Sequence, residues 1–178
     1  MRSALLSLLV LGAPLAAQTA NPFTDLARTT QASFPGKDHI GVVCDYSSSR
    51  EAVQQLADAL GTGRITVVDL KSRDQAGAAG VALRNAGAEL MVLLPKDRFV
   101  HDGAPHATLV AWRIAGAMPL VGTSRLALEN GAAFAIGEDT GHELLVNERL
   151  RGTIGPVTAP AKVARVGGSA QIAVLAAR

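Results

Sequence analysis

Short apolar runs alternate with longer amphipathic stretches from residue 38 onward. The runs are continuous, rich in Val, Ile and Leu and bounded by turn-forming residues, so they predict five strands, at 39–44, 64–70, 90–94, 119–122 and 133–136. Strands that alternate with helices are typical of a parallel sheet. The pattern therefore predicts an α/β fold in which residues 38–158 form a doubly wound, mainly parallel, five-stranded sheet with helices on both faces.

The stretches between the strands carry signals for helix starts and ends. Ser48 with Glu51 predicts a capping box at the start of the first helix, and Gly61 predicts its end. Further helices are expected from capping residues, an initial proline or a terminal glycine: Ser72 with Gln75 to Asn85 and Gly87, Pro105 to Ala115, Ser124 to Asn130, and Thr140 with Glu143 to Gly152.

The first residues have the features of a secretory signal peptide. Arg2 is followed by an apolar run over 4–15 and by the small residues Ala16 and Ala17, which suit cleavage. The apolar run is shorter than the roughly 20 residues that a membrane-spanning helix needs. The sequence therefore predicts that residues 1–17 are removed on export to the periplasm and that the mature chain does not insert into the membrane.

Two segments flank the predicted domain. Residues 18–37 have weak periodicity and predict either a lead-in linker or a short capping helix. The C-terminal tail, 159–178, contains an apolar stretch interrupted by Gly167 and Gly168, and it predicts a hairpin or an additional edge strand.

Composition and charge exclude several classes of protein. The chain has 178 residues, 48% of them hydrophobic and 18% charged, which fits one folded domain and not a disordered chain. Its 17 Lys and Arg are scattered among 15 Asp and Glu, so no basic stripe for nucleic acid is present. Cys44 is the single cysteine, which excludes a disulfide framework within the chain and a cysteine zinc site.

Ligands of doubly wound sheets bind beyond the carboxyl ends of the strands. The loops expected there are 45–50, 70–74, 95–106, 122–125 and 137–140. In the first of them, three serines and the backbone amides of a helix start suit a carboxylate or phosphate oxygen, and Tyr46 could stack on a ligand. The alternative is ordinary capping of a helix, for which serine is also preferred.

Other chemistry finds little support in the sequence. The first turn has no glycine for a dinucleotide pyrophosphate, and residues 77–80 predict close helix packing instead. His101 and His106 lie near Asp97 in the longest loop, but their spacing matches no common metal motif, so we expect a solvated loop without a metal. A hydrolase using Asp97 with one of these histidines is a further alternative, although no nucleophile motif is present. We expect no cofactor and no enzymatic activity.

Several short motifs occur in an order that resembles a known family. They are 37–46, Pro95 with Asp97, 118–124, 131–133, 136–139, 143–144 and 149–152. In this order, residues 37–158 resemble one lobe of the ABC-transporter substrate-binding protein-like family, which has the periplasmic binding protein type 1 fold, a relative of the flavodoxin-like sheet, and is associated with tryptophan and tyrosine uptake.

The resemblance implies a ligand site at the strand ends. The contacts that it implies are Tyr46, Ser47, Ser48, Asp97, Thr123, Ser124 and Asp139. Two lobes close over the ligand in that family, and residues 18–36 are too few for a second lobe, so we expect one lobe only. The chain also departs from the family after Leu144, where Leu145 and Val146 replace a glycine and an arginine.

Together these observations predict an exported, non-enzymatic protein that binds a small molecule such as an amino acid. The expected partners are an ABC-transporter permease or a second copy of the chain, and nucleic acid is not expected. The alternative is a protein-interaction module, without ligand, that docks on a transporter, on a sensor ectodomain or on itself.

Overall fold

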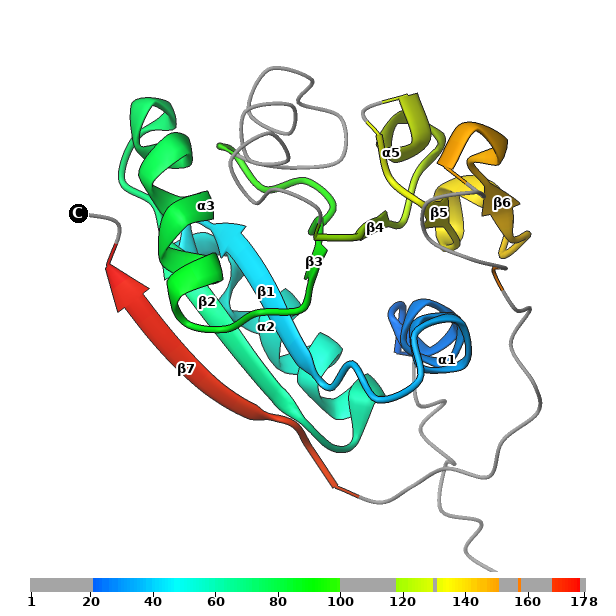
Figure 1. The fold of residues 1–178 in the computed structure, drawn as a ribbon, viewed down its shortest axis with the longest axis horizontal. Helices are drawn as coiled ribbons and strands as arrows, with labels where there is room; N and C mark the ends of the chain where they lie inside the picture. The colour runs from blue at the N-terminus through cyan, green and yellow to red at the C-terminus, as the bar shows by residue number, and fades with distance from the viewer. Residues whose placement is uncertain (1–20, 100–117, 130, 151–156, 158–167, 177–178) are drawn as a thin grey trace, which may run out of the picture.

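The computed structural model describes residues 21–99, 118–129, 131–150, 157 and 168–176 (Figure 1). The α-helices are α1 (Thr24–Ser33), α2 (Tyr46–Leu60), α3 (Ala76–Asn85) and α5 (Arg125–Glu129), and the short 3₁₀ helices are η1 (Arg73–Gln75), η2 (Glu138–Thr140) and η3 (Glu148–Leu150). The strands are β1 (His39–Cys44), β2 (Arg64–Asp69), β3 (Leu90–Val92), β4 (Leu120–Gly122), β5 (Phe134–Ala135), β6 (Leu145–Val146) and β7 (Gln171–Ala176).

These strands form one mostly parallel sheet in the order β6-β5-β4-β3-β1-β2-β7. Only the pairing of β5 with β6 is antiparallel among the described strands. The α/β class is confirmed, and the described residues contribute seven strands to the sheet where the sequence predicted five. The additional strands are β6 and β7, and β7 is the edge strand expected from the C-terminal tail. It pairs in parallel with β2.

Both faces of the sheet are buried against helices, and each face packs against different ones. Because side chains alternate along a strand, Val42 points to one face and Val43 to the other. On the first face, Leu26 of α1 and Leu56 of α2 are fully buried with Val42. On the second face, α3 packs against β1 and β2, α5 packs against β4 and β5, and Leu83 of α3 is fully buried in the same cluster as Val43. Burying both faces gives strands that are apolar throughout, as the sequence pattern indicates.

Helix α3 lies very close to β1. A Cβ atom at Gly41 would be 2.8 Å from a methyl carbon of Leu83 and 3.2 Å from the Cβ of Ala88. Glycine in this strand therefore makes room for the helix. The end of α3 matches its prediction, because Gly87 has a left-handed φ of +80° and its amide donates to the carbonyl of Arg84.

The segment before β1 contributes to the core. Of the linker and the capping helix that the sequence left open for residues 18–37, the structure contains the helix, α1, which packs against α2. Phe34 follows α1 and stacks on Phe134 of β5, with 6.3 Å between ring centroids. Residues 1–17, the predicted signal peptide, lie outside the described residues.

The structure corrects two predicted helix caps. Helix α2 begins at Tyr46 and not at Ser48, because Asp45 is its N-cap and accepts a hydrogen bond from the Ser47 amide. The Ser48 hydroxyl instead donates to the backbone carbonyl of Asp45. Ser72 also makes no capping hydrogen bond, and the 3₁₀ turn η1 precedes α3. The predicted helix over 105–115 lies outside the described residues.

The helix predicted to start at Thr140 is also wrong in the described part of the chain. Thr140 ends η2, and the chain then turns through Gly141 and His142, whose φ angles are +63° and +62°. Leu145 and Val146 follow as β6 and pair antiparallel with β5. The apolar spacing in this segment therefore belongs to an edge strand, and pairing with β5 outweighs the local capping signal.

Buried polar contacts join β1 and β2 at their amino ends. A guanidinium nitrogen of Arg64 lies 2.9 Å from Nδ1 of His39. Because a guanidinium can only donate, Nδ1 accepts, and Nε2 carries the proton that it shares with the Thr66 hydroxyl at 2.7 Å. Burial first, and then the positive charge of Arg64, lower the pKa of His39 from its ordinary value of 6.5.

This lowered pKa predicts a pH-dependent stability. In the pH range below 6.5 and above the folded-state pKa, the unfolded chain binds a proton at His39 that the folded protein does not. The free energy of unfolding should therefore fall as the pH falls through this range and reach its full value above it. Urea unfolding of the protein and of His39→Gln at several pH values measures this effect. The difference between the two should change with pH, and parallel curves would contradict the prediction.

Candidate functional site

Three aspartates lie at the carboxyl ends of neighbouring parallel strands. Asp45 comes directly after β1, Asp69 is the last residue of β2, and Asp97 lies in the loop after β3. Because these strands are adjacent and parallel, their carboxyl ends meet at one edge of the sheet. The sheet order also reverses here, since the chain passes from β1 to β2 on one side and continues to β3 on the other. This is the edge at which the sequence predicts a ligand site.

Asp97 connects the loops that follow β1 and β3. Its Oδ2 accepts hydrogen bonds from the Asp45 amide at 2.9 Å and from the Ser49 hydroxyl at 2.6 Å. Its Oδ1 accepts from the amide of Phe99, also at 2.9 Å. The Asp97 side chain is buried, so these donors take the place of water. Asp97 therefore holds the start of α2 in position, and neither of its oxygens is unoccupied.

The start of α2 does not offer its amides to an anion, as the sequence suggested. The Tyr46 amide donates to Asp69 at 3.0 Å, and the Ser47 amide donates to the Asp45 side chain at 3.2 Å. The amides of Ser48 and Ser49 both donate to the backbone carbonyl of Asp45. The protein's own carboxylates and carbonyl thus accept from these amides, which fits the alternative of ordinary helix capping and not amides that are free for an anion.

The hydroxyls in this turn point their protons inward. Ser47 Oγ donates to Oδ1 of Asp45 at 2.6 Å, and Ser48 Oγ donates to the Asp45 carbonyl at 3.1 Å. Both serines are exposed, and Tyr46 is half-buried beside them. Their oxygens therefore present acceptor lone pairs to solvent, so this surface suits a hydrogen-bond donor.

Two exposed cations balance the aspartates. Lys71 lies 2.7 Å from Asp69, and Arg98 lies 3.0 Å from Asp45 while its guanidinium sits 4.3 Å above the ring of Phe99. The hydrogen bond from the Ser47 hydroxyl, with a smaller effect of Arg98, lowers the pKa of Asp45. A hydrogen bond with Asp69 raises the pKa of Lys71.

No group of His, Cys, Asp and Glu able to hold a metal ion occurs among the residues that the structure describes.

The remaining predicted site residues follow β4 and β5. Thr123 and Ser124 are buried, and Ser124 caps α5 as predicted, with its hydroxyl 3.4 Å from the Ala127 amide. A Cβ atom at Gly137 would be 2.8 Å from the carbonyl of Thr123, so the loops after β4 and β5 touch at this glycine. Asp139 lies two residues further, on η2, with its side chain exposed.

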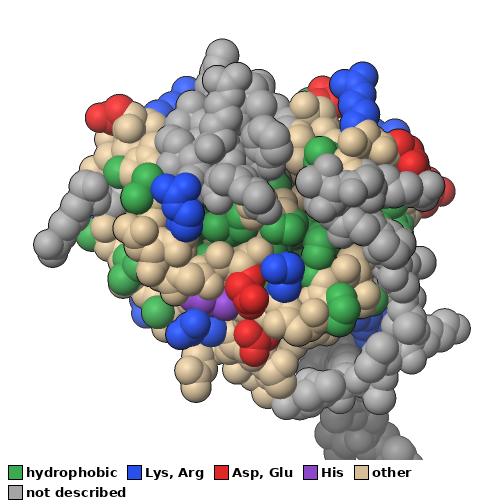
Figure 2. Space-filling model, viewed as in Figure 1, with side chains coloured by type: hydrophobic (Ala, Val, Ile, Leu, Met, Phe, Trp, Pro, Cys, Tyr) green, Lys and Arg blue, Asp and Glu red, His purple; other side chains and the backbone are tan. Residues whose placement is uncertain are grey.

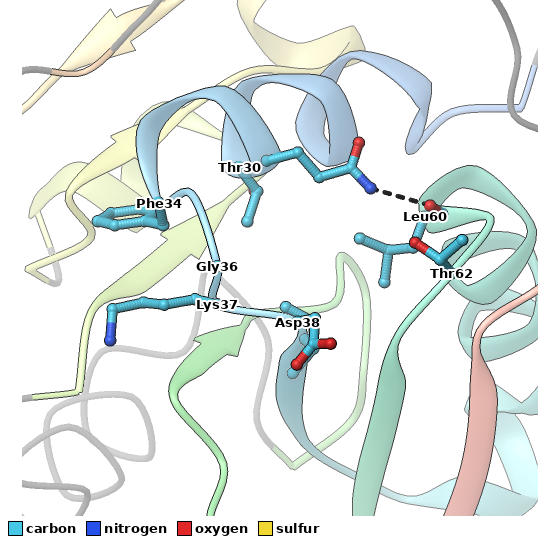
Figure 3. Close-up of a pocket in the computed structure, with 9 residues that line it drawn as sticks. Thr30, Phe34, Gly36, Lys37, Asp38, Leu60 and Thr62 are labelled. Carbon is cyan, nitrogen blue, oxygen red and sulfur yellow. Dashed lines mark hydrogen bonds between the residues drawn. The ribbon is translucent and has the colours of Figure 1, made fainter.

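A pocket lies at the opposite edge of the sheet, near the amino ends of β1 and β2 (Figure 3). Its volume is about 120 Å³, and it is lined by Thr30, Gln31, Phe34, Gly36, Lys37, Asp38, Ile40, Leu60 and Thr62. Gln31 bridges across one side by donating to the Leu60 carbonyl at 2.9 Å. None of the predicted site residues lines this pocket.

The sequence interpretation missed this pocket because it left residues 18–37 as a segment outside the domain. The signal available was Phe34-Pro35-Gly36, which ends a helix just before the first strand. In the structure, Thr30 is buried at this place and its hydroxyl oxygen has no hydrogen-bond partner.

The two described histidines lie in different surroundings. His39 is buried between Arg64 and Thr66, and His142 lies 3.1 Å from Asp25 on the surface. His101 and His106, which the hydrolase alternative requires, lie outside the described residues.

Comparisons with known proteins add no family assignment. No protein-family model matches the chain, and no match is found among curated proteins. The resemblance to one lobe of a substrate-binding protein therefore stays a prediction.

Among the described helices, none has the length and apolar character required to cross a bilayer. Figure 2 shows acidic and basic side chains interspersed on the face viewed.

The contacts of Asp97 predict that it stabilises the fold. Asp97→Ala leaves the buried Ser49 hydroxyl and the Asp45 amide without their acceptor, and each such loss costs about 1–3 kcal/mol. We expect a decrease of about 2 kcal/mol or more in the free energy of unfolding, measured by urea denaturation. Asp139→Ala, an exposed aspartate at the same edge, is the control and should change stability by less than about 0.5 kcal/mol. Equal effects of the two substitutions would contradict the assignment.

Cys44 is predicted to be unreactive in the folded protein. Burial raises the pKa of this thiol, and the nearby carboxylates of Asp97, Asp69 and Asp45 raise it further. Because the thiolate is the reactive form, a disulfide reagent should label Cys44 only after denaturant is added. Absorbance of the released thiol measures labelling, and rapid reaction of the native protein would contradict the buried position.

Proposed function

We propose that this chain is an exported, non-enzymatic domain that binds a small molecule at the carboxyl edge of a doubly wound α/β sheet, as one lobe of an ABC-transporter substrate-binding protein does. In this proposal residues 1–17 direct the chain to the periplasm and are removed. The ligand lies over the point between β1 and β3 where the strand order reverses, and it is an amino acid or a related amine.

The observation that carries this proposal is the anchoring of α2 by Asp97. Three hydrogen-bond donors converge on one buried carboxylate and fix the loop after β1 relative to the loop after β3. A surface that is fixed before binding loses less conformational freedom when a ligand arrives. Asp97 is thus a positioning residue, and the groups that contact the ligand are the exposed ones around it.

The exposed groups favour a ligand that carries an amino group. Ser47 and Ser48 donate their own protons inward and can accept hydrogen bonds from outside. Asp139 adds an exposed carboxylate at the same edge, and the half-buried ring of Tyr46 offers an apolar surface. Thr123 and Ser124 are buried and hold the ends of β4 and α5, so their part is to position Asp139 and its loop.

Thermal unfolding against a panel of compounds tests the proposal. The panel contains amino acids, simple amines, carboxylates, sugars and purines. A ligand at 100 times its dissociation constant stabilises a protein by about 2.7 kcal/mol, which raises the melting temperature by several degrees. We expect such a shift for amino acids or amines and none for carboxylates that lack an amino group.

Matched variants locate the site. Ser48→Ala and Asp139→Asn should abolish most of the shift, while Ser169→Ala, an exposed serine at the opposite edge, should keep it. Thr62→Trp fills the mouth of the pocket at the amino edge and should also keep it. Loss of the shift in Thr62→Trp alone would place the ligand in that pocket, and no shift with any compound would contradict small-molecule binding.

A further inference from the structure

Strand β7 is the last strand of the sheet, and one of its sides has no partner among the described residues. It pairs with β2 along one side, and it is the last strand in the sheet order, so no described segment pairs with its other side (Figure 1). Apolar side chains of β7 are also exposed to solvent: Val174 is 44% exposed and Leu175 is 39% exposed.

Within β7 itself, three features by which proteins protect edge strands are missing. Residues 171–176 contain no charged side chain and no proline, and the regular register with β2 contains no bulge. Exposed edges of this kind are templates for pairing with another strand. The absence of charge matters most for pairing with an identical strand, because two copies of a charged strand would repel each other.

The backbone of β7 sets the register of such a pairing. The Gln171 amide donates to the Gly63 carbonyl next to β2, so alternate residues beginning at Gln171 face β2. Ile172, Val174 and Ala176 therefore direct their amides and carbonyls outward. In an antiparallel pair of two β7 strands, these residues can all hydrogen-bond when Val174 lies opposite Val174 of the second copy and Ile172 lies opposite its Ala176.

We propose that two copies of this chain associate through β7 by antiparallel pairing centred on Val174, which makes one continuous sheet across a two-fold axis. The pairing satisfies the outward backbone groups, and it places apolar side chains opposite one another on both faces. The second copy fits this edge because it offers a strand of the same length, the same outward pattern and the same lack of charge. This inference does not depend on the proposed ligand site, which lies at the ends of the strands.

The oligomeric state is the first test. Sedimentation equilibrium of the purified protein over a range of concentrations should show a species of twice the chain mass. Val174→Pro removes an outward amide and leaves the amides that face β2, and edge strands tolerate proline at such a position. We expect this variant, and Val174→Lys, to weaken dimerisation at least tenfold while they retain cooperative unfolding. Leu126→Lys is the control, because Leu126 is 49% exposed on α5, and it should dimerise as the unchanged protein does.

Cross-linking tests the register and remains informative if one variant fails to fold. Cβ atoms of residues directly opposite in an antiparallel pair are about 5 Å apart. A short bifunctional maleimide should therefore link Val174→Cys into covalent dimers, while Leu126→Cys should stay monomeric. The buried thiol of Cys44 gives little background. A protein that is monomeric at all concentrations, or a dimer that persists in both Val174→Pro and Val174→Lys, would overturn the proposal.

Discussion

The carboxylate of Asp97 is the contact on which the carboxyl edge of this sheet depends. A charged group with its side chain withdrawn from water is costly unless hydrogen bonds replace its hydration, and here two amides and a hydroxyl do so. Since these donors come from the loop after β1, from the first turn of α2 and from the loop after β3, the same contact joins the two halves of the sheet where the strand order reverses. The position of the start of α2 follows from this arrangement, because the Asp45 amide and the Ser49 hydroxyl both bind Asp97.

The two ends of the parallel strands differ in how their polar groups are hydrogen-bonded. At the carboxyl edge the hydrogen-bonding groups of α2 are directed onto the protein's own carboxylates, which leaves a fixed surface of acceptor oxygens. At the amino edge, a pocket remains between α1 and the first strands, and the hydroxyl of Thr30 beside it has no partner. The hydrogen-bonding groups at the carboxyl end are bound to one another, whereas the amino end keeps an open cavity. A binding experiment therefore needs one variant at each end to show which end the ligand contacts.

Features set by local sequence were predicted well, and those set by distant contacts were not. The bounds of β1 and the end of α2 at Gly61 follow from apolar runs and a terminal glycine, and both are confirmed. Leu145 and Val146 look helical on their own, but β5 provides a partner that the local pattern does not contain. Likewise, the amide of Tyr46 is taken by Asp69, more than twenty residues away, so a helix start that looks available in the sequence is occupied in the fold.

The pairing of β2 with β7 brings together segments that lie far apart in the chain, since Arg64 is opposite Gln171. A ribosome makes the chain from its amino end, so β1, β2 and the helices that cover them are complete long before their last neighbour exists. During that interval the outer edge of β2, with the apolar residues Val67 and Val68, stays unpaired. The pairing of β2 with β7 is therefore available only once residues 171–176 have emerged, and until then the edge of β2 is a site at which incomplete chains can pair with one another.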